Sequence, residues 1–481
     1  MYMYKTKPFK HQEVVIDDSW ERPYYGLFME MGLGKSKVAI DTVGKLKLKG
    51  DIDSVMIVAP KGVYDNWIKQ EIPNHLPDEI ERFVVRWQPS TSKAFQDSMQ
   101  KLVFEMMAGI KFFVINVEAF SSDRGKKAAY YFLKKNPDNM MIVDESTTIK
   151  NRKASRTKNI MQLGKYAKYK RILTGSPVTK SPMDLYSQCA FLDAMSLDQA
   201  SFFAFQNRYA IVQKRFMGAR SFNEITGYRR LDELNEKLNK FSVRTLKEDC
   251  LDLPDKIYVK RNVPLTAEQT KLYTQMKKYA LAQLDEGQLA TTASVLTQIM
   301  RLQQICCGYL VSDEGEMKVL DNNRMTELLA AIEECSGKII IWCNYTHDII
   351  EIEKALSSKY GGDSVATYYG GTKQDDRQQT VDNFQDIHNP LRFFVGQPKT
   401  GGYGITLTAA NTMIYYSNSY DLEIRLQSED RAHRIGQKKA VTYIDLIVED
   451  TIDEKIVKSL REKINLAGQV LGEEQKRWLL N

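Results

Sequence analysis

The chain has 481 residues, with 68 Lys and Arg against 61 Asp and Glu, and 43% of its residues are hydrophobic. This length predicts two to four domains, and the ordinary apolar fraction excludes the disordered and fibrous classes of protein. No apolar run reaches the roughly 18 residues that span a bilayer, the N-terminus lacks the apolar core of a secretory signal, and the six cysteines form no CxxC pair. We therefore expect no membrane segment, disulfide framework or zinc ribbon, and a reducing compartment such as the cytoplasm.

The first motif lies between a strand predicted over residues 27–29 and a helix predicted over residues 37–48. The loop between them, MGLGKS, has two glycines whose flexible backbone lets amide groups converge on phosphate oxygens. Lys35 would reach the outer phosphates of a nucleotide, and the Ser36 hydroxyl would bind Mg²⁺. Met29 occupies the place of the first Gly in the strict phosphate-loop pattern. A coincidental GKS at the start of a helix is therefore the alternative.

After this loop and helix, short apolar runs rich in β-branched residues alternate with helical patterns. This alternation is typical of a parallel sheet covered on both faces. They occupy residues 55–59, 112–115, 140–143 and 171–173. Asp144 and Glu145 follow the third run, at the sheet edge where ligands bind in such folds. We expect Asp144 to hold Mg²⁺, directly or through water, and Glu145 to orient or deprotonate an attacking water. A helix cap is the alternative.

Two segments are strongly basic. Residues 150–180 contain ten Lys or Arg and no acid, and residues 208–230 contain six against one acid, Glu224. A solvated face is the alternative to a binding surface for either segment.

The middle of the chain has a different pattern from its two ends. Residues 180–320 show helical periodicity, as in residues 231–241 and 268–284, with few strand runs and no evident wedge hairpin. A second series of apolar strands follows at residues 339–342, 393–395, 413–416 and 441–447, which predicts a second α/β domain. The tail from residue 451 predicts a pair of helices broken at Gly468 and Gly472.

In chain order, the motifs resemble those of superfamily-two helicase-related ATPases, and more closely the Swi/Snf-type translocase family, over roughly residues 5–470. Each segment is similar to a named motif of that family: FKHQ at 9–12 to the adenine-reading Q motif, MGLGKS to its phosphate loop, 59–67 to motif Ia, DESTTIKN at 144–151 to the DEAH segment, LTGSP at 173–177 to LTGTP, GGYG at 401–404 to motif V, and QSEDRAHRIGQ at 427–437 to motif VI.

Several positions depart from the family pattern. Thr147 replaces the His of DEAH, so coupling between the motifs at 144–151 and 173–177 is expected to use other hydrogen bonds. Ser176 replaces Thr, Thr406 replaces Asn, and residues 420–422 replace Trp-Asn-Pro. The missing Gly at Met29 is shared with the family's own phosphate loop. The chain resembles a minimal motor, closer to viral or bacterial members than to nucleosome remodellers.

The resemblance implies an α/β fold with two RecA-like parallel-sheet lobes in tandem and helical insertions between them. The expected parts are lobe 1 (1–180), its helical insertion (181–250), a linker and helical region (251–323), lobe 2 (324–450) and C-terminal helices (451–481). The nucleotide would contact Gln12, Gly32, Leu33, Gly34, Lys35, Ser36, Gly402, Gly404 and Gln427. Ser36 and Asp144 would bind magnesium.

Lobe 1 shows no arginine for the γ-phosphate in its motifs, whereas motif VI contains Arg431 and Arg434. On a helix their spacing of three would place both on one face. By resemblance they are catalytic arginine fingers, alongside Lys35, Asp144 and Glu145, and such a finger is worth about 10³–10⁵ in rate. The alternative is a surface ion-pair face with the neighbouring acids.

The resemblance also implies a nucleic-acid track. The expected contacts with its phosphates, which carry little sequence preference, are Lys61, Asn66, Trp67, Lys150, Asn151, Lys399 and Thr400. Trp67 is equally well explained as a packed core anchor.

These motifs predict an ATP- and Mg²⁺-dependent translocase on double-stranded DNA that remodels protein–DNA complexes or branched DNA. The preference for duplex DNA rests on the resemblance alone. Two alternatives stay open, a strand-separating helicase or RNA-directed ATPase, and a non-hydrolysing nucleic-acid clamp. We expect a monomer, either associated with the nucleoid or, for a viral protein, in the host cytoplasm.

Overall fold

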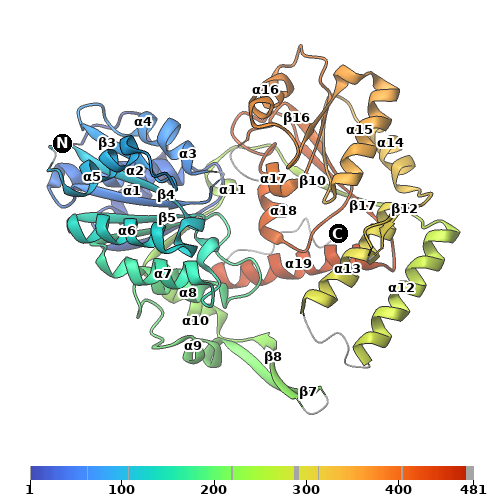
Figure 1. The fold of residues 1–481 in the computed structure, drawn as a ribbon, viewed down its shortest axis with the longest axis horizontal. Coiled ribbons are helices and arrows are strands. Elements are labelled where there is room, and N and C mark those ends of the chain that lie inside the picture. Colours follow the sequence, from blue (N-terminus) through green and yellow to red (C-terminus); the bar gives the residue numbers. More distant parts are fainter. Residues whose placement is uncertain are drawn as a thin grey trace. The chain divides into compact units, whose positions relative to one another are not determined.

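The computed structural model describes residues 2–61, 63–106, 108–217, 220–285, 292–312, 314–401 and 405–472. The chain divides into two compact units, and Figure 1 labels many of their helices and strands. Unit 1 comprises Met1–Lys214, Asn223–Asp252 and Leu466–Gln475, and unit 2 comprises Arg215–Phe222, Leu253–Asn465 and Lys476–Asn481. Each unit is built on its own parallel sheet.

The sheet of unit 1 has seven parallel strands in the order β3-β4-β2-β5-β6-β1-β9. The strands are β1 (Tyr24–Met29), β2 (Ser54–Ala59), β3 (Arg82–Arg86), β4 (Ile110–Asn116), β5 (Asn139–Asp144), β6 (Tyr169–Leu173) and β9 (Ser242–Thr245). Every residue of the central strands β2 and β5 is buried.

Helices cover both faces of this sheet because successive side chains of a strand point to opposite sides. Val55 and Ile57 pack in one core, and Met56 and Val58 pack in the other. The first core is completed by α1 (Lys10–Ser19), α2 (Lys35–Lys49), η1 (Trp67–Glu71) and α4 (Ile72–His75), near the short α3 (Tyr64–Asn66) and α11 (Lys247–Cys250). The second is completed by α5 (Lys93–Phe104), η2 (Val117–Ser121), α6 (Asp123–Lys135), η3 (Ser146–Ile149), α7 (Ser155–Leu163), α8 (Asp184–Leu192), α9 (Phe202–Tyr209) and α10 (Leu231–Asn239), with η4 (Gly164–Tyr166) following α7.

Unit 2 has a six-stranded parallel sheet in the order β10-β17-β16-β13-β15-β14. The strands are β10 (Lys256–Asn262), β13 (Lys338–Trp342), β14 (Val365–Tyr368), β15 (Phe393–Gly396), β16 (Ala410–Tyr415) and β17 (Val441–Ile447). A short antiparallel pair, β11 (Tyr309–Val311) and β12 (Met317–Val319), lies outside this sheet.

Two cores again lie on the two faces, with Ile339 and Ile341 in one and Ile340 and Trp342 in the other. The described residues of this unit also form α12 (Ala267–Asp285), α13 (Thr292–Cys307), α14 (Arg324–Glu334), α15 (Thr346–Tyr360), η5 (Gly362–Ser364), α16 (Gln374–Gln385), α17 (Pro398–Gly401), α18 (Leu422–Glu429) and α19 (Ile452–Leu471), which runs on into unit 1. Both units therefore confirm the expected fold class, parallel α/β sheets with helices on both faces.

Within the two large sheets, the strands that the apolar runs did not predict share one property. β3 and β9 are the two edges of the first sheet, and β10 and β14 are the two edges of the second. Edge strands have one neighbour and partly exposed side chains, so they lack the continuous apolar run of a central strand. The apolar runs therefore indicated only the central strands of the two large sheets.

The segment expected to be a helical insertion, residues 181–250, contains helices and three strands. One strand is β9, and the other two form a hairpin of β7 (Ala210–Met217) and β8 (Arg220–Tyr228) (Figure 1). The helical periodicity of this segment indicates its helices but not this hairpin. The hairpin mixes charged and apolar residues on largely exposed strands, which hides the usual alternation of a half-buried strand.

The prediction of a helix break at Gly468 was wrong, because α19 continues through this residue to Leu471. Val470 and Leu471 are buried in the core of unit 1, and such packing outweighs the roughly 1 kcal/mol that Gly costs in a helix. The helix ends where Gly472 has a φ of 69°. A second helix predicted for the tail would lie over residues 473–481, outside the described residues. In the described part of the chain, no helix combines the length and apolar character needed to cross a membrane.

Candidate functional site

The loop between β1 and α2 has the backbone that its glycines predict. Gly32 has a φ of 83° and Gly34 a φ of 80°, both in the left-handed region that disfavours other residues. A Cβ atom on Gly34 would lie 2.3 Å from the Nε2 atom of Gln12. The loop therefore requires glycine here for two reasons, its backbone angle and the close approach of Gln12.

Lys35 is the first residue of α2, and its ammonium group folds back over the loop. Its Nζ donates to the carbonyl oxygens of Met29 at 3.0 Å and Glu30 at 3.4 Å. Ser36 follows, half-buried, in the first turn of the helix. The free amide groups and the dipole at a helix N-terminus favour a phosphate, so this arrangement fits a phosphate-binding site.

Gln12 supports the same loop from α1. Its Nε2 donates to the carbonyl oxygen of Leu33 at 3.0 Å, and its Oε1 accepts from the backbone N–H of Phe9. His11 also contacts the Leu33 oxygen through Nε2 at 3.1 Å. Gln12 thus lies beside the predicted nucleotide contacts, and its reading of adenine stays a prediction.

Asp144 ends β5 and lies in the same row of the sheet as Leu27 of β1, the strand that leads into the loop. Asp144 pairs with Leu173 of β6, and Leu173 pairs with Leu27 of β1. The motifs that follow β1, β5 and β6 therefore leave the sheet side by side at its carboxyl edge, where parallel sheets bind ligands.

The Asp144 carboxylate is buried, with 7% of the residue exposed, and both of its oxygens accept hydrogen bonds. Oδ2 accepts from the indole Nε1 of Trp67 at 2.8 Å, and Oδ1 accepts from the backbone N–H of Glu145 at 2.9 Å. Desolvation by burial raises the pKa of Asp144, and these two hydrogen bonds together with the charge of Lys35 oppose that rise. A cation at this point would stabilise the charged form.

Glu145 has a strained backbone, with φ 46° and ψ 60° in the left-handed region. Such a conformation costs of order 1–3 kcal/mol for a residue other than Gly and is concentrated at functional sites. Glu145 occupies the N-cap position of η3, and its side chain makes no capping hydrogen bond. The alternative interpretation of this motif as a helix cap therefore lacks the expected bond.

Mg²⁺ and ATP are implied by these motifs, and the residues present fit them. Mg²⁺ prefers oxygen ligands, which the Ser36 hydroxyl and the Asp144 carboxylate supply. The Asp144 carboxylate is buried, and the N–H groups of Trp67 and Glu145 already hold its orientation. Lys35 and the amide groups of the loop carry the positive charge that the phosphates of a nucleotide require.

The link between the motif at 144–151 and the motif at 173–177 passes through α8. The Ser146 hydroxyl donates to Oε1 of Gln188 at 2.7 Å, and Nε2 of Gln188 donates to the Pro177 carbonyl at 2.8 Å. A parallel bond joins Nζ of Lys150 to Oγ1 of Thr179 at 2.7 Å. The replacement of His by Thr147 predicts different hydrogen bonds here, but no local pattern of the sequence distinguishes a buried Gln on a helix, so Gln188 was not among the predicted residues.

Arg244 of β9 lies in the segment 243–247, which resembles the family's stretch between the lobes, but the sequence assigned Arg244 itself no role. Its NH1 donates to the carbonyl oxygens of Phe28 and Gly175, each at 3.0 Å. It therefore joins the end of β1 to the motif after β6 from the edge of the sheet.

Trp67 requires a correction, since we expected it to contact nucleic acid. Its side chain is completely buried, and its N–H group is bonded to Asp144. A side chain in this position cannot reach a ligand on the surface, so the core-anchor alternative is right for Trp67.

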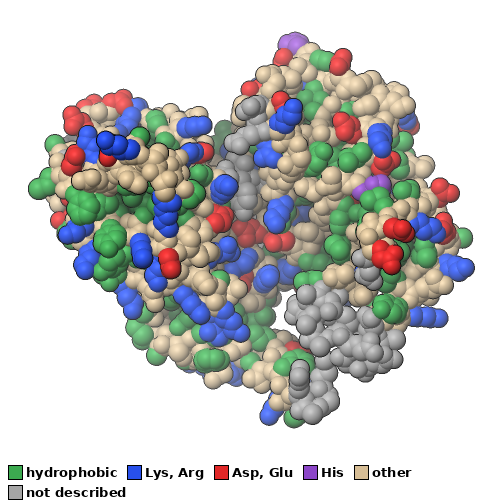
Figure 2. All heavy atoms as spheres, viewed as in Figure 1, with side chains coloured by type: hydrophobic (Ala, Val, Ile, Leu, Met, Phe, Trp, Pro, Cys, Tyr) green, Lys and Arg blue, Asp and Glu red, His purple; other side chains and the backbone are tan. Residues whose placement is uncertain are grey.

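The other predicted nucleic-acid contacts of unit 1 differ in exposure. Lys61, Asn66 and Asn151 are exposed, whereas Lys150 is half-buried and bonded to Thr179. Lys61 follows β2 and so lies at the carboxyl edge of the sheet. In Figure 2, basic side chains are frequent on the visible face of unit 1 formed by α6 and α7.

In unit 2, Lys399 is exposed and Thr400 is half-buried, and both lie in α17 directly after β15. They therefore lie at the carboxyl edge of the second sheet. Gly402 and Gly404, predicted to contact the nucleotide, lie outside the described residues. Gln427 is buried in α18.

Arg431 and Arg434 do not share a helix face, because α18 ends at Glu429. The spacing argument was wrong, yet the two side chains converge by another route. NH1 of Arg431 donates to the Ile405 carbonyl at 3.1 Å, and NH1 of Arg434 donates to Oγ1 of Thr406 at 2.9 Å. Thr406, one of the departures from the family pattern, is thus the partner of Arg434.

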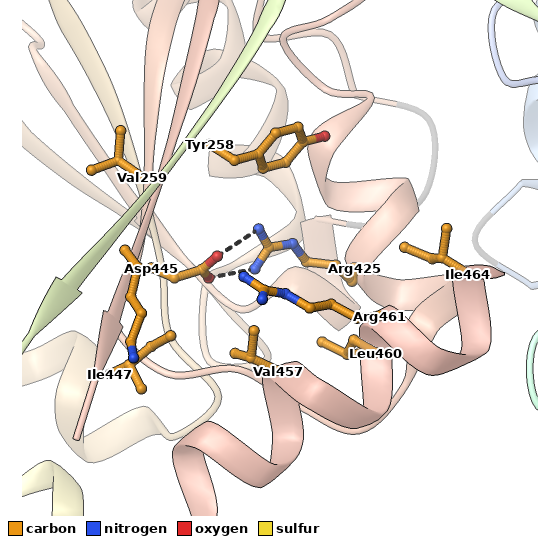
Figure 3. Close-up of a pocket in the computed structure, with 10 residues that line it drawn as sticks. Tyr258, Val259, Arg425, Asp445, Ile447, Val457, Leu460, Arg461 and Ile464 are labelled. Carbon is orange, nitrogen blue, oxygen red and sulfur yellow. Dashed lines mark hydrogen bonds and ion pairs between the residues drawn. The ribbon is translucent and has the colours of Figure 1, made fainter. Parts of the chain in front are cut away.

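Arg425 of α18 forms an ion pair with Asp445 of β17 beside a small cavity (Figure 3). Arg425 pairs with both carboxylate oxygens of Asp445 at 2.6 and 3.1 Å, and its Nε donates to Glu429 at 2.9 Å. Tyr258 of β10 donates to the same Glu429 at 2.8 Å. The adjacent cavity measures about 40 Å³, enough for a water molecule and far too small for a nucleotide. This cluster therefore holds Glu429, the last residue of α18, shortly before Arg431 in the chain.

Two family descriptions match the chain: an SNF2-related domain over residues 26–309, and a helicase conserved C-terminal domain over residues 322–436. The chain is 25% identical over 460 residues to the SWI/SNF chromatin-remodeling complex subunit snf22 of Schizosaccharomyces pombe. It is 25% identical over 465 residues to the SWI/SNF-related matrix-associated actin-dependent regulator of chromatin subfamily A member 1 of Homo sapiens.

Each of these matches covers 92% of this chain, but only 26% and 41% of the respective relative. The chain thus spans about a quarter to two fifths of the length of these relatives. Among solved structures, it is similar to the Sulfolobus solfataricus SWI2/SNF2 ATPase core in complex with dsDNA, with 22% identity and a TM-score of 0.44 over 99% of this chain and 97% of that chain.

Proposed function

Because the chain belongs to the SNF2-related family of helicase-like ATPases, we propose that it is an ATP-driven translocase on double-stranded DNA that remodels protein–DNA complexes or branched DNA. The observation that carries the proposal is the row of motifs at the carboxyl edge of the sheet in unit 1. There the phosphate loop, the buried Asp144 and the strained Glu145 follow neighbouring parts of one sheet. This is the arrangement that phosphoryl transfer requires.

Each residue has a distinct task in this proposal. Lys35 and the loop amides bind the phosphates of ATP, and Ser36 and Asp144 hold Mg²⁺. When bound, Mg²⁺ neutralises charge on the phosphate oxygens. Glu145 orients the attacking water and accepts its proton, because its carboxylate follows Asp144 at the same edge.

Arg431 and Arg434 stay our candidates for arginine fingers, and their convergence on residues 405–406 is the observation in their favour. The proposed DNA contacts are the exposed residues Lys61, Asn66, Asn151 and Lys399, with Lys150 and Thr400 beside them. Contacts of this kind bind the phosphate backbone and predict little dependence on DNA sequence.

The test is steady-state ATP hydrolysis at one fixed salt concentration, without nucleic acid and with single-stranded DNA, duplex DNA, branched DNA or RNA. We expect strong stimulation by duplex or branched DNA, and Lys35→Ala serves as the control for contaminating ATPases. Stimulation by single strands or RNA only would replace the proposal with the helicase alternative. The absence of hydrolysis with every nucleic acid would favour the non-hydrolysing clamp, although such a clamp has no need of Lys35, Asp144 and Glu145 together.

One observation favours the strand-separating alternative as a second candidate. The hairpin of β7 and β8 carries Phe216, which is 73% exposed, and Phe222, which is 51% exposed. Exposed aromatic rings beside basic residues can stack on unpaired bases. Under this alternative, Phe216→Ala together with Phe222→Ala abolishes strand separation of a forked DNA and leaves duplex-stimulated ATP hydrolysis within about twofold. Unchanged strand separation in the double variant would exclude the hairpin as a wedge.

A further inference from the structure

Trp67 and Asp144 lie 77 residues apart in the chain and meet through one hydrogen bond. The indole Nε1 donates to Oδ2 of Asp144 at 2.8 Å, and the Trp67 side chain is completely buried. The indole has one polar atom, which can only donate. Its whole hydrogen-bonding capacity is therefore committed to the carboxylate that we assign to Mg²⁺.

The carboxylate is held at two points that fix its plane. Trp67 binds Oδ2, and the backbone N–H of Glu145 binds Oδ1. Outer partners of this kind orient metal ligands, and their loss typically lowers metal affinity by about 10–100-fold. The backbone donor adjoins Asp144 in the chain, so Trp67 is the donor that the tertiary structure adds.

The position of Trp67 in its helix also matters. It begins η1, a π-helical turn that directly follows Asn66, and such turns are rare and frequent at functional sites. Asn66 is exposed to solvent, and the next residue, Trp67, is buried and donates to the Asp144 carboxylate. The indole thereby connects the carboxylate to the segment that contains the proposed DNA contacts Lys61 and Asn66.

We propose that Trp67 is a positioning residue for Asp144, whose indole N–H holds the carboxylate in the orientation that binds Mg²⁺ and so sets the Mg²⁺ affinity of the nucleotide site. This inference rests on the proposed function, since it assigns Asp144 to Mg²⁺. It assigns Trp67 no contact with nucleotide or DNA.

The test compares Trp67→Phe with Trp342→Phe in the full chain. Both tryptophans are completely buried, but the Nε1 of Trp342 has no hydrogen-bond partner among the described residues, so its removal changes packing alone. The readout is the binding of a fluorescent ATP analogue, followed by anisotropy in EDTA and across a MgCl₂ series. Circular dichroism and thermal unfolding report folding.

We expect Trp67→Phe to raise the Mg²⁺ concentration for half-maximal binding by about tenfold or more, with nucleotide affinity in EDTA within about twofold of the parent chain. Trp342→Phe should match the parent chain in both the Mg²⁺ concentration for half-maximal binding and the nucleotide affinity in EDTA. If Trp67→Phe does not fold, 3-benzothienylalanine introduced at position 67 keeps the ring shape and lacks the N–H.

An unchanged Mg²⁺ dependence in a folded variant that lacks the N–H would overturn the role of Trp67 and leave the proposed function intact. An equal loss in Trp342→Phe would also overturn it, since packing alone would then explain the effect. A parent chain that binds no nucleotide at any Mg²⁺ concentration would overturn both the proposed function and this inference.

Discussion

At the scale of single residues, two adjacent carboxylates have different surroundings. Asp144 is buried and accepts two N–H donors, whereas Glu145 adopts a strained backbone at the start of η3. The same residue types in an exposed loop would be solvated acids. Burial and fixed donors fit the role of cation ligand that we propose for Asp144, and our proposal assigns the water to Glu145.

We predict that Glu145→Gln lowers the DNA-stimulated kcat for ATP hydrolysis by about 10²–10⁴-fold, because the amide cannot accept a proton. DNA affinity, measured by fluorescence anisotropy, should stay within about threefold, since Glu145 is not among the proposed DNA contacts. Lys35→Ala should also lose turnover. Turnover of Glu145→Gln at the level of the parent chain would refute the role assigned to this carboxylate.

Asp348 in α15 is a buried acid outside the motifs. It is 2% exposed, and its Oδ2 has no hydrogen-bond partner among the described residues. Desolvation by burial, the largest cause, raises the pKa of Asp348 from 3.8 to about 7, although Arg324 opposes the rise. The folded chain therefore keeps a proton that the unfolded chain releases above about pH 4. Stability from this group is present below pH 4 and is lost as the pH rises through about 7.

We predict that Asp348→Asn, which mimics the protonated acid, removes this pH dependence. The variant should become more stable than the parent chain as the pH rises from 5 to 8, by about 4 kcal/mol at most, from about 1.36 kcal/mol per pKa unit. Urea or thermal unfolding at several pH values measures the difference. Parallel pH profiles for the two chains would show that Asp348 does not titrate in this range.

At the scale of elements, helix α8 links two motifs that end neighbouring strands. Gln188 accepts from Ser146 after β5 and donates to Pro177 after β6. A buried amide that bonds both loops restrains their relative position more tightly than packing alone. Ser146 belongs to the motif at 144–151, whereas Gln188 belongs to none of the motifs.

We predict that Gln188→Leu lowers kcat by about tenfold and destabilises unit 1 by about 1–3 kcal/mol, because the Ser146 hydroxyl loses its buried acceptor. A double-mutant cycle with Ser146→Ala isolates the bond: the two changes should be clearly non-additive in kcat. Gln304→Leu, a similarly buried Gln in unit 2 whose Oε1 has no partner among the described residues, is the packing control. Additive effects in the cycle would show that the bond does not couple the two motifs.

At the scale of the whole molecule, the chain contains two units with separate sheets and separate cores. Exposed candidates for DNA contact occur at the carboxyl edge of each sheet, Lys61 in unit 1 and Lys399 in unit 2. The net charge of +7 over 481 residues is too small to attract DNA without such local contacts.

We predict that duplex-DNA affinity falls with salt at a log–log slope of about −5 if roughly six phosphates are neutralised. Lys61→Ala should reduce the size of this slope by about one. Titrations by anisotropy between 50 and 200 mM salt measure both. A salt-independent affinity would contradict a track of phosphate contacts.

The sequence alone determined the fold class, the central strands and the chemistry of the motifs. These features are local: an apolar run shows burial on both faces, and a strand, a glycine loop and a helix adjoin in the chain. The apolar pattern did not indicate the edge strands or the hairpin of β7 and β8, where exposure breaks it. The helix boundary before Arg431 lies among buried residues, and the spacing of the two arginines did not indicate it.

Only the tertiary structure decided which side chains meet. The partners Trp67 and Asp144 are 77 residues apart, and Ser146 and Gln188 are 42 apart. Their meeting depends on the strand order β2-β5-β6-β1, which no residue encodes locally. The structure therefore shows Trp67, predicted as a surface contact, as the buried partner of a carboxylate. A hydrogen bond depends on position in space rather than on spacing in the chain.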